Sequence, residues 1–372
     1  MTEHTDTGLP ADTQATAKLL LQGQALCDKQ LYLNLGEFSL SVASNSQPLL
    51  DRLEQYFSHL PQQKNKASVV IVAIESEVLE SGLPFIDWKR EPGKTGRKDA
   101  YMELPDGRLV LKVRTGMLFL QSQNWLIAAG PCLQNDNQLI NYINSQIMNR
   151  LQHQNWLISH AAGLMLGSNA LAIVGFSGGG KSTLMLHLME HPKSSFLTND
   201  RLFLRAGESC VEAVGIPKLP RINPGTVVNN ERLKGLINET RRSELLQMPK
   251  QALWDLEEKF DVDIDHFYGK DRINTSTPVP LTGLLILNWS RDETSPVEIK
   301  EVALSERSEL LKAVMKSPGP FYQDQQGRFL EDEDPLPTEP YQTLLKRVSV
   351  YEVTGQLDFE ALTALCFERW GS

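Results

Sequence analysis

The chain of 372 residues lacks the features of a secreted, membrane-spanning or nucleic-acid-binding protein. Its four cysteines lie far apart and form no C-x-x-C pair, which argues against a disulfide framework or a zinc site. No apolar run approaches the roughly 20 residues that span a bilayer. The formal net charge is −9 and no basic arm offsets it, so neither nucleic acid nor a membrane is an expected partner. The polar N-terminus lacks the basic and apolar regions of a signal peptide, so we expect a cytoplasmic location.

Length and composition indicate a globular protein that can bury a sizeable core. Hydrophobic residues make up 41% of the chain and aromatic residues 7%, both ordinary values for such proteins. We interpret residues 1–18, rich in Thr, Ala and Asp without periodicity, as a disordered tail. Apolar residues at helical spacing between 139 and 151 predict a helix that joins two domains. The predicted domains are an N-terminal α+β domain over 19–150 and a nucleotide-binding domain over 151–372.

One motif dominates the sequence. Gly175-Phe-Ser-Gly-Gly-Gly-Lys181-Ser182-Thr183 matches the phosphate-binding pattern G-x-x-x-x-G-K-S. The glycines permit positive-φ turns that point backbone N–H groups at phosphate oxygens, at the start of a helix. We expect Lys181 to reach the terminal phosphates and the Ser182 hydroxyl to bind Mg²⁺. The predicted nucleotide-binding residues are Gly175, Ser177, Gly178, Gly179, Gly180, Lys181, Ser182 and Thr183.

The segments around this motif support the interpretation. Residues 156–175 predict two adjacent apolar strands joined by a turn at Gly167-Ser168-Asn169, and the second strand leads into the loop. The Leu and Met residues of 184–189 predict the helix that must follow it. Further along the chain, 281–288 predicts a buried strand and 301–315 a helix.

A second candidate group is the turn Asn199-Asp200-Arg201, about twenty residues after the loop. A carboxylate at a strand end near a phosphate loop can hold Mg²⁺ or accept the proton of an attacking hydroxyl. The alternative is an exposed aspartate in a turn. The chain lacks the apolar run ending in Asp-Glu and the LSGGQ-like signature of transport ATPases, and the NKxD-like element of GTPases.

Other polar residues have weaker signals. By itself, His160 at the inner end of the predicted hairpin is expected to be a packed core residue. Glu212 is either a second metal ligand or an ordinary strand carboxylate. Single cations are more often solvated surface charges than catalytic groups. Four of them are nevertheless candidates for binding a transferred phosphate, namely Lys218, Arg221, Lys270 and Arg272.

Three of these segments together resemble a known family. Ser159-His160-Ala-Ala-Gly-Leu-Met-Leu166, the glycine-rich loop and Leu197-Thr-Asn-Asp200-Arg201 are similar to the core of HPr kinase/phosphorylase. PEP carboxykinases share that nucleotide-binding fold. With the stretch 31–57 included, the chain looks most like the group called HprK-related kinase B. The resemblance implies an α/β fold with an HPr kinase/PEP carboxykinase-type P-loop nucleotide-binding core and an N-terminal α+β domain, with ATP and Mg²⁺ as cofactors.

The resemblance also implies roles for individual residues. It puts His160 near the terminal phosphate, so the implied catalytic residues are Asp200, His160 and Lys181. Glu212, within Val-Glu-Ala-Val-Gly, is similar to the metal-binding glutamate of the family. The implied metal ligands are Ser182, Asp200 and Glu212. Asn199 stands where the family has the first aspartate of an acidic pair, so that base and metal duties both fall on Asp200 or a base is absent. The later Pro278-Val-Pro-Leu281 lacks the arginine of the corresponding family element, which argues against HPr as the substrate and against the reverse phosphorolysis.

These observations predict an ATP- and Mg²⁺-dependent kinase that transfers the γ-phosphate to a hydroxyl of a protein serine or a small molecule. The alternative is a non-catalytic nucleotide-sensing regulator or scaffold, which Asn199 keeps open. A PEP carboxykinase-like lyase is a third reading, but no second metal site is visible in the sequence. The identity of the acceptor, pyrophosphate as donor and assembly into a homo-oligomer all stay open.

Overall fold

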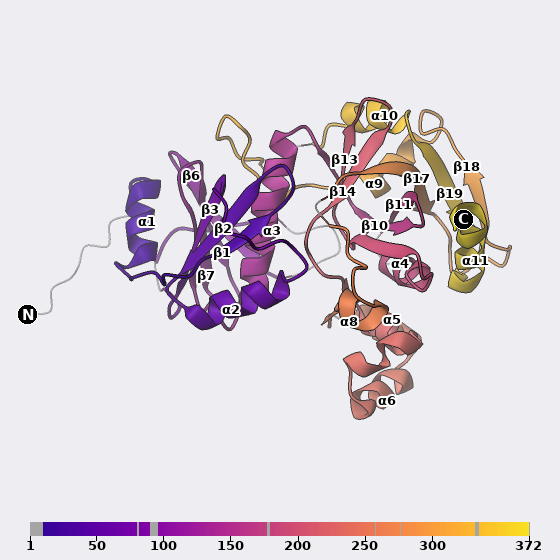
Figure 1. Ribbon diagram of the computed structural model, residues 1–372, viewed down its shortest axis with the longest axis horizontal. Helices are drawn as coiled ribbons and strands as arrows, with labels where there is room; N and C mark the ends of the chain where they lie inside the picture. Colours follow the sequence, from indigo (N-terminus) through magenta and orange to yellow (C-terminus); the bar gives the residue numbers. More distant parts are fainter. Residues whose placement is uncertain are drawn as a thin grey trace, which may run out of the picture. The chain divides into compact units, whose positions relative to one another are not determined.

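The computed structural model describes residues 10–79, 82–89, 96–176, 179–256, 258–275, 277–331 and 335–371. The chain forms two compact units (Figure 1). The first contains residues 1–154 and 318–335, and the second contains 155–317 and 336–372. Both units combine helices with β-sheet, so the predicted mixture of α and β structure is confirmed.

The first unit is built on a mixed sheet in which eight described strands follow the order β1-β2-β3-β8-β7-β6-β5-β4. The strands are β1 (Leu31–Asn34), β2 (Ser39–Ser44), β3 (Val69–Glu75), β4 (Ile86–Asp87), β5 (Asp99–Leu104), β6 (Gly107–Lys112), β7 (Met117–Ser122) and β8 (Leu126–Gly130). The helices are α1 (Thr13–Leu21), α2 (Gln47–Tyr56) and α3 (Asp136–His153). Strand β3 pairs in parallel with β2 and β8, and the other neighbours pair antiparallel.

Helix α1 corrects the predicted tail. Residues 1–9 of that tail lie outside the described residues, but residues from Thr13 onward form a helix. The Asp12 side chain caps it by accepting a hydrogen bond from the Ala15 N–H at 2.8 Å. Thr13 donates its backbone N–H and its hydroxyl to Asp106, at 2.9 and 2.6 Å. Leu20 is fully buried against the sheet, so a tertiary contact orders a segment that has little helical periodicity of its own.

Residues 318–335 differ from the predicted domain boundary, because they return to the first unit. The Phe321 ring lies 5.6 Å from that of Phe119 and 5.1 Å from that of Tyr142. The Phe321 carbonyl accepts a 2.7 Å hydrogen bond from the side chain of Asn149. Arg108 donates to the carbonyls of Pro320 and Leu330, at 3.2 and 3.3 Å. These contacts join residues some 200 positions apart in the sequence; Arg108 and Leu330, for example, are separated by 222 positions. A local sequence pattern cannot predict contacts over such separations.

The second unit contains a nine-stranded sheet with a path β12-β10-β11-β17-β14-β13-β9, to which β19 and β18 are added at β17. The strands are β9 (Leu157–Ser159), β10 (Ala161–Leu166), β11 (Asn169–Gly175), β12 (Ser194–Thr198), β13 (Leu202–Ala206), β14 (Val211–Gly215), β17 (Val279–Leu287), β18 (Glu298–Glu301) and β19 (Ser349–Thr354). The predicted hairpin over 156–175 is confirmed, since β10 pairs antiparallel with β11 from Ala161↔Val174 to Leu166↔Asn169.

The strand pairings form a ring that the chain itself closes, because β9 continues through His160 into β10. Strand β10 pairs with β11, β11 with β17, β17 with β14, β14 with β13, and β13 with β9. Only His160 separates β9 from β10, and only residues 199–201 separate β12 from β13. These two breaks face each other, since Leu202 pairs with Ser159 while Thr198 pairs with Gly163. Such a local irregularity redirects side chains out of the alternating pattern of a strand.

Helices cover the central strands on both faces. Side chains alternate along β11, so Leu171 and Ile173 belong to one apolar cluster while Ala172 and Val174 belong to another. The first cluster includes α4 (Lys181–Leu188) and α11 (Phe359–Trp370), and the second includes α9 (Leu311–Val314) and α10 (Glu339–Leu345). Burial on both faces explains why the strand before the glycine-rich loop is a continuous apolar run.

A group of short helices is inserted between β15 (Arg221–Ile222) and β16 (Phe260–Asp261), which pair with each other. Figure 1 shows α5, α6 and α8 together at one end of the second unit, away from its sheet. The helices are α5 (Pro224–Val228), a 3₁₀ helix (Glu231–Leu236), α6 (Glu239–Gln247) and α7 (Lys250–Asp255), followed after β16 by α8 (Ile264–Tyr268). Val228, Leu245 and Leu253 form a small core of their own within this group.

The predicted helix over 301–315 is wrong over most of its length. Residues up to Glu301 belong to β18, which pairs with β19, and the following helical turns are a 3₁₀ helix (Ser308–Leu310) and the four-residue α9. Across the described parts of both units, no helix has the length and apolar character needed to cross a membrane.

Gly215 allows β14 to approach β12 closely, because a Cβ at this position would lie only 1.8 Å from the Leu197 carbonyl oxygen. We expect Gly215→Ala to lower the free energy of unfolding by about 1–3 kcal/mol or more, since backbone atoms must move to admit the methyl group. The control is Gly225→Ala in α5, whose Cβ would meet only Leu253 at an ordinary 3.8 Å. That change should be neutral or slightly stabilising. Urea unfolding followed by circular dichroism tests both, and equal effects would contradict the explanation.

Candidate functional site

The glycine-rich segment connects the end of β11 to the start of α4, as predicted. Gly180 is the N-cap of α4 and has a φ of 86°, a conformation that glycine adopts without strain. A Cβ there would also collide with the Phe359 ring, at 2.5 Å. The Gly179 carbonyl accepts a 3.0 Å hydrogen bond from the Trp289 indole. The side chains of Phe359 and Trp289 thus pack against the turn at Gly179 and Gly180. The predicted loop residues Ser177 and Gly178 lie outside the described residues.

Lys181 begins α4 and folds back over the segment. Its ammonium donates to the Gly175 carbonyl at 3.0 Å. Burial lowers the pKa of Lys181, the nearby positive charges of Lys316 and Arg201 lower it further, and the Asp200 carboxylate opposes them. The lysine is therefore a partly desolvated cation that a polyphosphate would stabilise. Ser182 is half-buried in the first turn of α4.

Thr183 links the first turn of α4 to the inserted helices. Its hydroxyl lies 2.9 Å from the Thr226 hydroxyl of α5, and either group can donate. The Thr183 side chain thus contacts another element, whereas the Lys181 side chain contacts the loop segment itself. The backbone N–H of Thr183 is unaffected by this contact.

Asp200 lies in the break between β12 and β13 and contacts His160, which lies in the facing break between β9 and β10. The His160 Nε2 is 3.1 Å from Asp200 Oδ1, and Asp200 Oδ2 forms an ion pair with Arg201. The side chains are 27% and 45% exposed, so the pair is open to a ligand. Burial tends to raise the pKa of Asp200, but Arg201, His160 and Lys218 outweigh it and hold the pKa well below its ordinary value. The carboxylate is therefore ionised at neutral pH.

The surroundings of His160 favour its neutral form at neutral pH. The hydrogen bond to Asp200 favours its charged form, but burial and the positive charges of Lys181 and Lys316 prevail and lower its pKa. A neutral imidazole with its proton on Nε2 donates to the carboxylate. The expectation that His160 is an ordinary core residue is thus not met, because it contacts a carboxylate that the sequence singled out independently.

Strand register explains why these residues meet. His160 precedes Ala161, which pairs with Val174, so His160 lies beside the end of β11. Leu202 pairs with Ser159 on one side and with Gly215 on the other. The segment after Gly215 therefore runs past the turn that carries Asp200, and it brings Lys218 to this end of the sheet.

Two further cations belong to this cluster. Burial lowers the pKa of Lys218 to about 8, and the Asp200 carboxylate opposes this effect. Lys316 lowers the pKa values of both His160 and Lys181, so its charge also faces the site. The sequence analysis gave Lys218 as one of four candidate cations for binding a transferred phosphate, but it did not name Lys316. Lys316 follows α9, whose neighbour Met315 bridges to Ser159, and only this long-range pairing brings it here.

Glu212 is not brought to the site. It lies opposite Arg205 in the β13–β14 pair and forms an ion pair with Arg205 at 3.0 Å. Arg205 is three residues beyond Leu202, about 10 Å further along the strand from the turn. Among the described residues there is also no group of three or more His, Cys, Asp or Glu side chains that could hold a metal ion.

The side-chain oxygen of Asn199 is buried and has no hydrogen-bond partner in the described part of the chain. An oxygen acceptor left unpaired beside an ionised carboxylate suits a hard cation. Mg²⁺ favours few protein ligands and keeps several waters and phosphate oxygens. The oxygens of Ser182, Asn199 and Asp200 fit that requirement, with Asn199 in place of the predicted Glu212.

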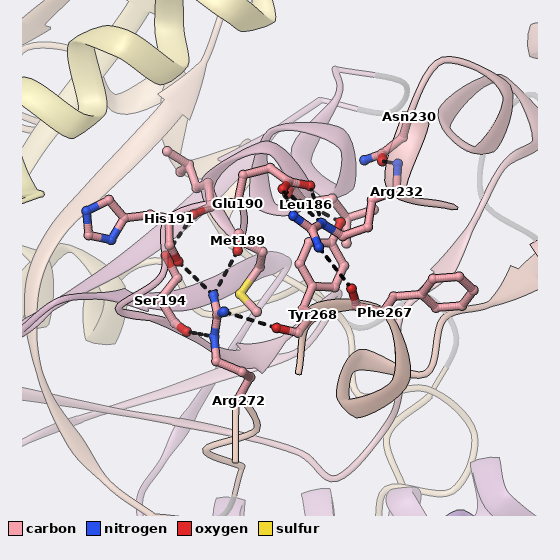
Figure 2. A network of polar contacts seen from close by, with 11 residues as sticks. Leu186, Met189, Glu190, His191, Ser194, Asn230, Arg232, Phe267, Tyr268 and Arg272 are labelled. Atoms are coloured by element: carbon pink, nitrogen blue, oxygen red, sulfur yellow. Dashed lines mark hydrogen bonds and ion pairs between the residues drawn. The ribbon is translucent and has the colours of Figure 1, made fainter. Parts of the chain in front are cut away.

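Arg272, a candidate for binding a transferred phosphate, instead binds backbone carbonyls (Figure 2). Its guanidinium donates to the carbonyls of Tyr268, Met189 and His191, at 3.2, 2.8 and 2.7 Å, and also to that of Ser194. The Met189 and His191 carbonyls follow the C-terminal end of α4, that of Tyr268 ends α8, and that of Ser194 begins β12. A cation is favoured at the C-terminal end of a helix. Lys270, the other candidate beside it, is exposed.

A second arginine extends the network shown in Figure 2. Arg232 pairs with Glu190 through Nε, at 2.9 and 2.8 Å, and donates to the Phe267 carbonyl at 3.3 Å. The Tyr268 hydroxyl donates to the Leu186 carbonyl at 3.4 Å. These contacts join the inserted helices to the end of α4, so α4 is held at its last turn as well as at Thr183.

No protein-family model matches the chain, and no curated protein matches it. Among solved structures, one similar chain is the Hpr(Ser) kinase/phosphatase from Coxiella burnetii. The two are 10% identical, and the match covers 57% of this chain and 89% of that one with a TM-score of 0.29. A similarity this low says nothing about function. The residues of the site are therefore the basis for any functional assignment.

The Arg272 network predicts a stability effect. Arg272→Met should lower the free energy of unfolding by about 2–3 kcal/mol, because backbone carbonyls lose a charged donor. Arg272→Lys should be intermediate, since an ammonium cannot span the same set of carbonyls. Lys270→Met, an exposed neighbour, is the control and should change stability by less than about 0.5 kcal/mol. Urea unfolding measures all three, and a control as damaging as Arg272→Met would remove the basis for this assignment.

Proposed function

We propose that the chain is an ATP- and Mg²⁺-dependent phosphotransferase that transfers the γ-phosphate to a hydroxyl acceptor, on a P-loop core of the HPr kinase type. The observation that carries the proposal is the convergence of Lys181, at the start of the loop helix, with the ionised Asp200 and neutral His160. Phosphoryl transfer requires little beyond positioning and charge neutralisation, and these groups supply both.

The loop and Lys181 bind the donor in this proposal. Backbone N–H groups at the start of α4 surround the β- and γ-phosphates. The Lys181 ammonium exchanges the Gly175 carbonyl for phosphate oxygens, which are stronger partners because they are charged. Ser182, Asn199 and Asp200 would hold Mg²⁺, which supplies neutralisation of charge on the phosphates.

Asp200 serves the acceptor. Its carboxylate accepts a hydrogen bond from the attacking hydroxyl and takes the proton as the new O–P bond forms and the bond to the leaving ADP breaks. A strong base is not required, because in a loose transition state the proton moves late. His160, through its hydrogen bond to Oδ1, orients the carboxylate. Arg201 holds the other oxygen.

A nucleotide-sensing regulator is the second candidate. It is favoured by Asn199, which replaces a carboxylate at the site, and by the lack of a three-ligand acidic or His/Cys metal group in the described residues. Such a regulator would bind ATP, change its affinity for a partner between ATP and ADP, and transfer no phosphate.

Removal of the loop lysine tests nucleotide binding. Lys181→Ala should weaken Mg·ATP affinity about ten- to a hundredfold, because a charge-assisted contact is worth about 1.5–3 kcal/mol. The fold should persist, since Lys181 is half-buried and faces the loop. Calorimetric titration measures the affinity, with the exposed Lys193→Ala as the matched control. Unchanged affinity in Lys181→Ala would refute the donor site.

Removal of the carboxylate tests transfer. Asp200→Asn should reduce turnover by about 10²–10⁴-fold while ATP still binds, because the proton acceptor is lost. Asn199→Asp should be tolerated or raise the rate, since a second carboxylate raises the basicity of its neighbour. The exposed Asp292→Asn is the control. The assay follows label from γ-labelled ATP into protein and metabolite fractions of a host lysate.

The same assay separates the two candidate functions, with Lys181→Ala protein as the blank. Transfer by the wild type above that blank supports the kinase. Wild-type ATP binding without transfer above the blank would favour the regulator instead.

A further inference from the structure

Lys218 is a cation of the site to which the proposed binding of the phosphate donor assigns no role. It is half-buried, and within the described residues its ammonium has neither a hydrogen-bond nor an ion-pair partner, although its backbone N–H donates to the Ile216 carbonyl. The other nearby charges on its side are paired, since Arg201 contacts Asp200 and Arg221 pairs with Asp261 at 2.9 Å. A desolvated, unpaired ammonium is costly to maintain, and an anion relieves that cost.

Strand order puts Lys181 and Lys218 on opposite sides of Asp200. Lys181 follows β11, which pairs with β10 and so lies beside His160. On the other side of His160 lies the turn that carries Asp200, and Asp200 Oδ1 is 3.1 Å from His160 Nε2. The segment that continues β14 lies beyond that turn. Since Gly215 pairs with Leu202, Lys218, three residues after Gly215, lies opposite the residues that precede Leu202.

Electrostatic coupling agrees with this order. The charges of Asp200 and Arg201 act on both lysines. Both ammonium groups therefore belong to the surroundings of the same carboxylate, and the strand order gives them its two sides. Donor and acceptor of an in-line transfer need the same arrangement, because the hydroxyl approaches phosphorus from the side opposite the leaving ADP.

We infer that the acceptor is a small hydroxylated anion whose carboxylate or phosphate group binds Lys218 while its hydroxyl meets Asp200. This inference rests on the proposed kinase function and specifies its substrate class. We favour a small molecule because Lys218 is half-buried, and a short anion needs less free surface around the ammonium than a polypeptide does. In the step, the acceptor oxygen bonds to the γ-phosphorus, the bond to ADP breaks, and the hydroxyl proton goes to Asp200.

The test measures anion binding without turnover. The full-length protein is saturated with Mg²⁺ and the non-hydrolysable analogue AMP-PNP, which fills the γ-phosphate position. Three probes are then titrated by calorimetry: inorganic phosphate, glycerate and neutral glycerol. Phosphate or glycerate should bind and glycerol should not. The two anions distinguish a phosphate-bearing acceptor from a carboxylate-bearing one, since the one that resembles the true acceptor binds more tightly.

The variants identify the residue responsible. Lys218→Met should weaken anion binding at least tenfold and leave AMP-PNP affinity unchanged, whereas Lys218→Arg should retain most of the anion affinity. The control is Lys312→Met, which removes an exposed lysine of α9. If AMP-PNP does not bind the wild type, the proposed function fails. If AMP-PNP binds but neither anion does, or Lys218→Met binds them as the wild type does, the inference about the acceptor is overturned and a neutral or protein acceptor is indicated.

Discussion

The contact between His160 and Asp200 is the feature on which the rest of the site depends. His160 is the single residue between β9 and β10, and Asp200 lies in the turn between β12 and β13. Their contact therefore joins two neighbouring stretches of chain at the points where the strands of both are interrupted. Were either strand regular, these side chains would alternate into the core or away from it. The paired breaks instead direct an imidazole and a carboxylate toward the end of β11, where the glycine-rich turn begins. Lys181 follows β11 on one side of this carboxylate, and Lys218 follows β14 on the other.

Helix α4 is the second constraint, because it carries the loop at one end and must be held in place. Thr183 contacts the inserted helices through Thr226 near its first turn, and Arg272 and Arg232 bind its last turn and the residues that follow. These arginines act on backbone carbonyls and a surface carboxylate far from the cluster around Asp200. Their role is to fix the helix and the start of β12, which lead to Lys181 and Asp200 respectively.

Local patterns predicted the elements whose signals are local. The apolar runs of β10 and β11, the turn between them, the helix after the glycine-rich segment and the strand at 281–288 all lie where the sequence indicated. The predictions of a tail over 13–18 and of a helix over most of 301–315 were wrong for a common reason. Thr13 is held by Asp106, and Glu301 is paired with Tyr351, so partners distant in the sequence decide both conformations. The return of residues 318–335 to the first unit depends on Phe321 in the same way.

The sequence by itself determined the glycine-rich loop, its lysine and the carboxylate of Asp200, because each follows directly from a strand whose apolar run is visible in the chain. Only the tertiary structure decided which other charged residues join them. Register along β13 and β14 separates Glu212 from the turn and brings Lys218 to it, while the bridge from Met315 to Ser159 delivers Lys316. A shift of register moves a residue by about 3.3 Å per position, and register is set by pairing across the whole sheet. No window of the sequence contains that information.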